Sequence, residues 1–195
     1  MISDEALMLE FQGGSRAAFE ELFARYREPL YGFFRRRLNR PERAEDLTQE
    51  TFLAILHAVN HYEPRALFRT YLYGIALKLL AAERRKGRRD GQGVGSDPEP
   101  TTQDSPDAAL WIRQALARLE EPEREILMLR EYEQLSYVEI AELLHLPVNT
   151  VRSRLFRARM ALKNYLDPQE ETHSVMATRA TESVAALGTE EEAQQ

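Results

Sequence analysis

The sequence contains no cysteine, no long uninterrupted apolar run and no basic segment followed by an apolar one at its N-terminal end. The absence of cysteine excludes a disulfide framework, a zinc–thiolate site and a cysteine nucleophile. A spanning helix needs about 20 consecutive apolar residues, so no stable membrane insertion is expected. The first ten residues, MISDEALMLE, are acidic where a secretory signal would be basic. These absences together predict a cytoplasmic protein.

The charge of the chain is unevenly distributed. Of the net charge of −6, the whole amount lies in residues 167–195, which hold seven acidic residues and one arginine. The rest of the chain is neutral overall, but its basic residues gather in three clusters, at 35–40, 84–89 and 152–159. Local potential decides affinity for nucleic acid more than net charge does. Each cluster taken alone is equally compatible with a solvated helix end.

One segment, residues 90–107, interrupts the globular composition. It reads DGQGVGSDPEPTTQDSPD, with three glycines, three prolines, five acidic residues and no basic residue. Such a segment buries too little apolar surface to offset its ordering entropy, which predicts a flexible acidic linker. Fully extended it would reach roughly 60 Å. We therefore expect domains at 1–89 and 108–166, joined by this linker, with an acidic, disordered tail at 167–195.

The remaining pattern is helical, and the predicted fold is all-α with two small helical domains. Apolar residues recur three to four apart, and no strand-like alternation competes. Ser15 is placed to cap one helix, and Pro41 suits the first turn of a helix that runs to about Val59. A loop over 60–69, broken by a proline, precedes a largely apolar helix at 70–86.

The segment 135–162 has the pattern of a helix-turn-helix. Ser136 and Glu139 form a capping box, after which the first helix is expected to bury Val138, Ile140 or Ala141, and Leu144. A short turn at 145–146 follows, and Pro147 starts the second helix. Two short helices joined by a tight turn are typical of DNA-binding modules.

Helical phase predicts what the second helix does. At about 100° per residue, Leu155, Ala158 and Leu162 fall near Val151 and form an inward stripe. The opposite face and its flanks carry a hydroxyl, an aromatic ring and guanidinium groups, the mixture expected of a recognition helix in the major groove. The predicted DNA-binding residues are Asn149, Thr150, Arg152, Ser153, Arg154, Phe156 and Arg157. Arg157 is suited to a guanine edge and Phe156 to a thymine methyl. The alternative is an arginine-rich solvated helix.

The helix at 41–59 carries a narrow polar strip on an otherwise apolar surface. Asp46, Glu50 and His57 line the strip, with Gln49 and Leu53 at its edge. Such a strip is suited to docking a partner, although periodicity alone favours a solvated polar face.

Three segments in this order resemble the extracytoplasmic-function (ECF) sigma factors: AEDLTQETFLAIL, FRTYLYGIA and VNTVRSRLFRARMAL. The resemblance covers about residues 1–166. It implies a sigma region 2 domain that binds the β′ clamp helices of core RNA polymerase and melts the −10 element. It also implies a region 4 domain that reads the −35 element of promoter DNA and contacts the β flap. An anti-sigma factor is the implied regulatory partner. The polymerase contact would fall on Asp46, Gln49, Glu50 and Leu53.

Promoter melting requires aromatic and cationic groups that trap unstacked bases. The candidates are Tyr62, Arg69, Tyr73, Lys78, Arg84 and Arg85, whereas Phe68 and Tyr71 are better core candidates. The chain departs from the family pattern at Tyr71, where tryptophan is usual, at Leu77 and Lys78, where arginine and asparagine are usual, and at Ala82, where aspartate is usual. A lysine at position 78 can still bind phosphate, so these departures leave the general assignment unchanged.

Two other functions compete with transcription initiation. A free-standing helix-turn-helix regulator would bind duplex DNA without polymerase. An enzyme would need a phosphate-binding loop, a nucleophile elbow or a metal-spaced His/Asp cluster, and the sequence has none of them. No cofactor and no metal are therefore expected. The tail at 167–195 reads either as a control element or as an inert extension.

Overall fold

A computed structural model describes residues 2–38, 40–64, 67–89 and 106–166. These residues form α-helices and one short 3-10 helix, and none of them lies in a strand. The elements are α1 (Asp4–Gln12), α2 (Arg16–Arg35), α3 (Pro41–Ala58), η1 (Val59–His61), α4 (Phe68–Arg89), α5 (Pro106–Ala117), α6 (Glu121–Glu131), α7 (Tyr137–Leu144) and α8 (Val148–Leu166). The predicted all-α fold with two helical domains is confirmed. Most of the predicted linker and all of the predicted tail lie outside the described residues.

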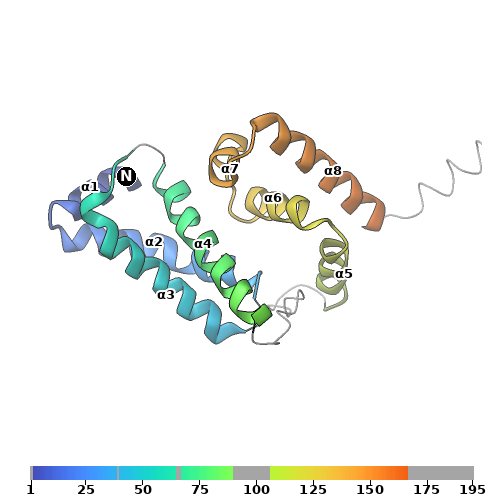
Figure 1. The fold of residues 1–195 in the computed structure, drawn as a ribbon, viewed down its shortest axis with the longest axis horizontal. Coiled ribbons are helices and arrows are strands. Elements are labelled where there is room, and N and C mark those ends of the chain that lie inside the picture. Colours follow the sequence, from blue (N-terminus) through green and yellow to red (C-terminus); the bar gives the residue numbers. More distant parts are fainter. Residues whose placement is uncertain (1, 39, 65–66, 90–105, 167–195) are drawn as a thin grey trace, which may run out of the picture.

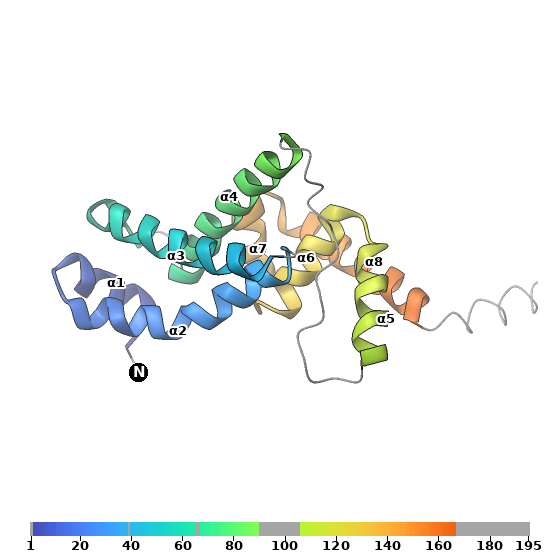
Figure 2. The same cartoon turned by 90° about the horizontal axis from the view of Figure 1, so that it is seen from below.

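The helices form two groups that lie side by side (Figures 1 and 2). Helices α1 to α4 make the first group, in which α2 packs against α1 and α3, and α3 against α4. Helices α5 to α8 make the second group, in which α8 packs against α5, α6 and α7. Helix α4 also contacts α7, so the two groups meet along this helix.

Capping residues define several ends of the first group as the sequence predicts. The Ser15 side chain accepts a hydrogen bond from the backbone of Ala18 at the start of α2, and Pro41 occupies the first turn of α3. The buried residues of α2 include Leu22, Leu30 and Phe33. Their spacing places them on the face that packs against the neighbouring helices.

Helix α4 begins at Phe68, two residues before the predicted start. The backbone N–H of Phe68 donates to a Glu5 carboxylate oxygen at 2.8 Å. Glu5 belongs to α1, a helix that the sequence pattern did not predict and that Ser3 caps. A cap supplied by a residue so distant in the chain satisfies one of the open donors at the start of α4.

The helix-turn-helix of the second group has the predicted capping box. The Ser136 side chain accepts from the Glu139 backbone, and the Glu139 carboxylate accepts from the Ser136 backbone. His145 ends α7 in the left-handed conformation, with φ of 53°. Ile140 is buried as expected, but the prediction for Val138 is wrong, because this side chain is 55% exposed. Val138 lies in the first turn of α7. A shift of one position along a helix rotates a side chain by about 100°, which is enough to turn it from the core to the solvent.

Among the described residues, no helix is both long enough and apolar enough to cross a bilayer.

Candidate functional site

Helix α8 has one buried face and one chemically mixed exposed face. Val151, Leu155 and Ala158 are buried, which confirms these members of the predicted inward stripe, whereas Leu162 is only half-buried. On the other side Phe156 is 63% exposed, and Ser153 and Arg157 are also exposed. The Phe156 ring therefore leaves apolar surface on this face that the fold does not use.

Local hydrogen bonds orient several polar side chains of this face. The Arg157 Nε donates to Glu123 of α6 at 2.7 Å, and Arg159 donates to Glu131 at 2.7 Å. Within the helix, Arg152 donates to the Asn149 side chain at 3.3 Å. The remaining predicted residues lie on the same helix: the Thr150 carbonyl accepts from the Ser153 hydroxyl, and Arg154 is half-buried at the edge of a groove. Glu123 and Glu131 are the residues that sequence reasoning missed, because they come from another helix.

The predicted docking strip lies on the exposed side of α3. Asp46 and Leu53 are 59% and 51% exposed, and Gln49 and Glu50 are also accessible to solvent. The structure adds Arg43, which pairs with Asp46 at 3.4 Å and with Glu50 at 2.9 Å. The strip is therefore a mixed polar patch rather than a purely acidic one.

Arg43 also links α3 to α4 through Glu83 at 2.9 Å. The hydrogen bond to Glu83 raises the pKa of Arg43 more than its partial burial lowers it. Arg43 therefore stays charged, and its ion pairs connect two carboxylates of the strip, Asp46 and Glu50, to Glu83 of α4.

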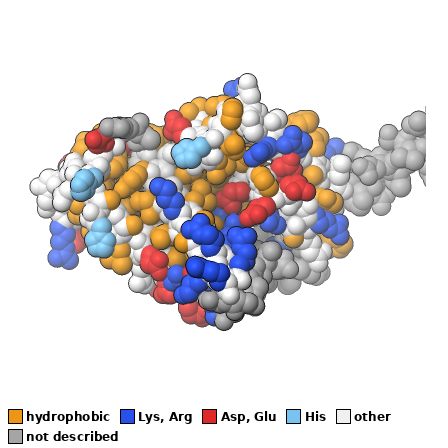
Figure 3. Space-filling view, viewed as in Figure 1, with side chains coloured by type: hydrophobic (Ala, Val, Ile, Leu, Met, Phe, Trp, Pro, Cys, Tyr) orange, Lys and Arg blue, Asp and Glu red, His pale blue; other side chains and the backbone are white. Residues whose placement is uncertain are grey.

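The predicted melting residues divide into cations and buried rings. Among the cations, Lys78 and Arg85 are exposed, whereas Arg69 and Arg84 are half-buried and ion-paired. Arg69, Lys78, Arg84 and Arg85 follow one another along α4, and further basic side chains gather at its C-terminal end (Figure 3). Tyr62 and Tyr73, however, are only 5% and 4% exposed, and burial raises the pKa of each hydroxyl to about 12. The structure thus does not place these two rings where a base could stack on them. The sequence missed this because the burial of both rings depends on tertiary packing. Tyr73 lies against Phe33 of α2, and Tyr62 lies against Phe68 and Tyr71 at the start of α4.

The ring contacts show which neighbours bury them. Tyr62 lies 5.4 Å from Tyr71, centre to centre, and Tyr73 lies 5.4 Å from Phe33. The core assignment of Phe68 is confirmed, since this side chain is 1% exposed.

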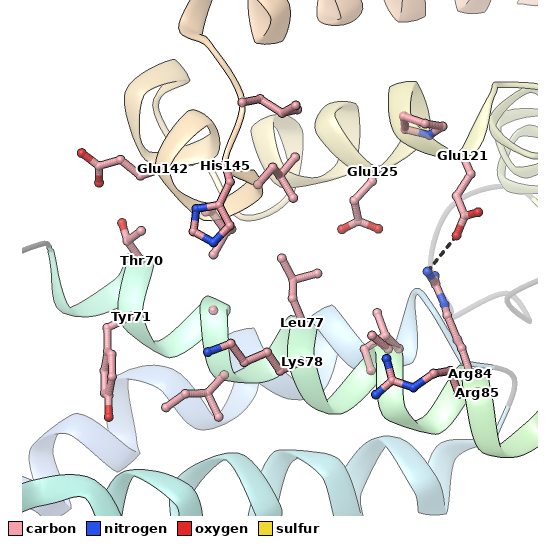
Figure 4. A pocket seen from close by; sticks show the side chains of 18 of the residues that line it. Thr70, Tyr71, Leu77, Lys78, Arg84, Arg85, Glu121, Glu125, Glu142 and His145 are labelled. Atoms are coloured by element: carbon pink, nitrogen blue, oxygen red, sulfur yellow. Dashed lines mark hydrogen bonds and ion pairs between the residues drawn. The ribbon is translucent and has the colours of Figure 1, made fainter.

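A groove of about 1050 Å³ lies between α4 and the helices α6 and α7. Figure 4 shows Lys78 and Arg85 on the α4 side and Glu142 and His145 on the opposite side, with the Arg84–Glu121 ion pair at one end. Gly74 and Leu143 both line the groove, and a Cβ added at Gly74 would lie 3.6 Å from a Leu143 methyl carbon.

Ion pairs on either side of this groove join the two groups of helices. Arg37 donates to Glu125 and to Glu133, each at 2.9 Å, and Arg36 donates to Glu133 at 3.2 Å. Arg69 makes a two-pronged contact with Glu139, at 2.5 and 2.6 Å. Burial alone would raise the pKa of Glu139, but the hydrogen bonds from Arg69 and Ser136 outweigh it and lower the pKa to about 2.

The part of the chain that the structure describes holds no group of three or more His, Asp or Glu side chains arranged to bind a metal ion. The predicted site residues on α4 and α8 instead offer cations, an exposed aromatic ring and hydrogen-bonding side chains. These are the groups that bind nucleic acid and protein surfaces.

Comparisons with known proteins match both halves of the chain. Residues 22–90 match the family model for sigma-70 region 2, and residues 109–162 match the model for sigma-70 region 4. The RNA polymerase sigma-H factor of Pseudomonas aeruginosa is 32% identical over 182 residues, which cover 85% of this chain and 94% of the relative. The ECF RNA polymerase sigma-E factor of Haemophilus influenzae is 31% identical over 184 residues, which cover 86% and 97%.

A solved structure shares the fold. CnrH, in complex with the cytosolic domain of CnrY, matches with a TM-score of 0.66 and 27% identity. The match covers 85% of this chain and 98% of CnrH, so the likeness includes both groups of helices.

Proposed function

The chain belongs to the ECF family of RNA polymerase sigma factors, and from this membership we propose how its residues divide the work of promoter recognition. The protein is an alternative sigma factor that binds core RNA polymerase and directs it to specific promoters. We assign residues 1–89 to region 2 and residues 108–166 to region 4. Residues 90–107 and 167–195 are the proposed linker and tail.

Reading of the −35 element is assigned to α8. The observation that carries this assignment is the placement of Ser153, Phe156 and Arg157 on the face opposite the buried stripe. This face meets base edges, while Arg152 and Arg154 lie beside it at positions suited to phosphate. Glu123 holds the Nε of Arg157 and so limits the directions in which its two terminal nitrogens point toward a guanine.

Docking on the β′ clamp helices is assigned to the exposed strip of α3, namely Asp46, Gln49, Glu50 and Leu53. The strip combines an exposed leucine with carboxylates, the composition of an interface in which an apolar contact is surrounded by charge. Contact with the β flap is assigned to region 4.

Capture of the −10 element is assigned to the cations of α4, namely Arg69, Lys78, Arg84 and Arg85. Tyr62 and Tyr73 are left out of this surface in the described arrangement because both rings are buried. Lys78 stands where the family usually has asparagine, and a lysine in this place offers a point charge to a phosphate.

Regulation by an anti-sigma factor is part of the proposal. CnrH was solved with the cytosolic domain of a second protein, and its fold extends over both regions of this chain. The sigma factor family acts without catalysis, and we assign no catalytic group to this chain. Its work consists of binding and of trapping opened DNA.

The test is run-off transcription from promoter-bearing fragments with purified core polymerase, with and without the chain. The chain should confer start sites that core polymerase alone does not use. Asp46→Ala should reduce the run-off product at least tenfold, whereas Glu45→Ala, an exposed carboxylate on another face of α3, should leave it unchanged. Specific binding to duplex DNA without any effect on polymerase would instead support a free-standing regulator.

A further inference from the structure

The groove between α4 and the helices α6 and α7 has an apolar floor. Its volume of about 1050 Å³ is at the upper limit of small-molecule pockets, which measure roughly 300–1,000 Å³. Five half-buried aliphatic side chains line it from its two sides: Ile75, Leu77, Leu143, Leu144 and Leu146. The groove is therefore large enough for a peptide segment and offers such a segment an apolar contact.

Two buried hydroxyl groups also line the groove. Tyr62 and Thr70 are 5% and 7% exposed. Neither hydroxyl has a hydrogen-bond partner in the described part of the chain, although buried polar groups are nearly always hydrogen-bonded. Figure 4 shows Thr70 at one end of the groove, across from Glu142. The backbone of a peptide segment in the groove would supply partners for both hydroxyls.

The charges along the groove favour an acidic occupant. Two of the lining carboxylates already have arginine partners, since Glu121 pairs with Arg84 and Glu125 pairs with Arg37. Four further lining cations form no ion pair within the part of the chain that the structure describes: Lys78, Arg85, Arg88 and Arg154. Among the described lining carboxylates, Glu142 alone has no ion pair. The unpaired charge of the groove is therefore positive.

The tail at 167–195, which lies outside the described residues, has the opposite charge. It holds seven acidic residues and one arginine. Six of the acidic residues lie on either side of residues 174–187: Asp167, Glu170, Glu171, Glu190, Glu191 and Glu192. Residues 174–187 themselves are neutral overall and hold most of the apolar residues of the tail. An apolar segment with acidic flanks matches a groove with an apolar floor and unpaired cations.

The apolar residues of this segment recur at helical spacing. Four of them are three or four positions apart and share one side of a helix: Met176, Ala180, Val184 and Leu187. Ser174 precedes them and Gly188 follows, which are residue types that begin and end helices. At about 100° per residue, Thr178 and Ala185 fall on the opposite side. The pattern thus predicts one apolar side that the groove can receive.

The segment is close enough in the chain to reach the groove. Helix α8 has 19 residues and a length of about 28 Å. It begins two residues after Leu146, which lines the groove, and ends at Leu166, where the tail starts. Residues 167–175 span roughly 30 Å when extended. They can therefore return along α8 and bring Met176 to the groove.

We propose that residues 174–187 dock in this groove, with their apolar side on its floor and the acidic flanks beside its cations. A segment tethered to its site has an effective concentration on the order of millimolar, so a weak contact suffices. The docking itself does not depend on the proposed function. Its consequence does, because Lys78 and Arg85 are assigned to promoter DNA, and the acidic flanks compete with a phosphate backbone for them.

The experiment measures the position of the tail in the full chain. The chain has no cysteine, so cysteines introduced at Thr181 and at Ala81, which is exposed in the groove, carry spin labels to these two positions. Pulsed electron resonance should then find one narrow population of short label distances. Val184→Asp with Leu187→Asp puts two charges on the apolar side and should replace this population with a broad one at longer distances.

Thr178→Asp with Ala185→Asp is the matched control, since it adds the same charge to the opposite side of the same segment. It should keep the narrow population. Fluorescent single-stranded DNA of mixed sequence should bind about threefold more tightly to the Val184 and Leu187 variant than to the control, because the groove is vacant in more molecules. Broad distances in the chain with an unaltered tail, or equal distances in the two variants, would overturn the docking. Longer distances without tighter DNA binding would overturn the competition.

Variants of the groove test the role of charge from the other side. Lys78→Gln with Arg85→Gln removes two exposed cations and should lengthen the label distances, as should added salt in the unaltered chain. Arg16→Gln with Arg27→Gln removes two exposed cations of α2 and should leave the distances unchanged. Distances that respond neither to salt nor to Lys78 and Arg85 would overturn the role of the acidic flanks. Failure of run-off transcription by the unaltered chain would instead remove the proposed function and would not affect the label distances.

Discussion

Arg37 and Glu133, separated by almost a hundred residues in the sequence, form an ion pair at 2.9 Å in which both side chains are excluded from water. The pair joins region 2 to region 4. The same Glu133 oxygen also accepts from Arg36, so one carboxylate binds two guanidinium groups, and Glu125 supplies Arg37 with a second carboxylate.

Replacing Glu133 should weaken this contact strongly. Glu133→Ala leaves the buried guanidinium of Arg37 with Glu125 as its remaining carboxylate partner. This change should lower the free energy of unfolding by about 3 kcal/mol. Glu131→Ala removes an exposed pair and should lower it by less than about 1 kcal/mol. Urea denaturation followed by circular dichroism gives both values. Equal losses in the two variants would show that the Arg37 site is not buried in solution.

The Arg69–Glu139 pair predicts a pH dependence. The pKa of Glu139 in the folded chain, about 2, lies below its ordinary value of 4.5. Ionised Glu139 therefore contributes stability that is fully present above about pH 4.5 and is lost as the pH falls toward 2. The melting temperature of the unaltered chain should accordingly fall more steeply over this range than that of Glu139→Gln. Parallel pH profiles would contradict the predicted pairing.

Neighbouring residues of α8 should separate DNA binding from stability. Phe156→Ala should reduce affinity for −35 DNA by about 1–3 kcal/mol and leave the melting temperature unchanged, because the ring is exposed. Leu155→Ala, on the buried face, should lower the free energy of unfolding by about 3 kcal/mol. Promoter binding by the holoenzyme and thermal unfolding measure the two effects. A large loss of stability in Phe156→Ala would place this ring in the core instead.

The cap that Glu5 provides to α4 predicts a local effect. Glu5→Ala removes the acceptor for the Phe68 N–H and should destabilise the first turn of α4 by about 1 kcal/mol. Amide hydrogen exchange at the start of α4 should then become faster. Glu10→Ala, an exposed carboxylate of the same helix α1, should leave these amides unaffected.

Local patterns predicted the helices well because caps and helical phase act over a few residues. The Ser15 cap, the capping box at Ser136 and the inward stripe of α8 were all visible in the sequence. Val138 was misplaced because a helix of eight residues offers too few positions to fix its phase.

Contacts between distant segments were not predictable in the same way. The cluster at 35–40 read as one basic patch, but Arg37 lies in the interior and bonds to carboxylates far along the chain. Tyr62 and Tyr73 read as exposed rings, but aromatic neighbours bury them. The surroundings of these residues depend on tertiary packing that periodicity does not encode.

Glu139 has one further consequence, which concerns rates. Its carboxylate accepts hydrogen bonds from Arg69 and from the Ser136 backbone N–H at the same time. The Ser136 hydroxyl caps α7 through a separate hydrogen bond, which it accepts from the Glu139 backbone N–H. When Arg69 departs, the first turn of α7 therefore keeps its terminal hydrogen bonds, and no refolding step accompanies the exchange. The rate at which Arg69 and Glu139 separate should then contain no contribution from refolding of α7.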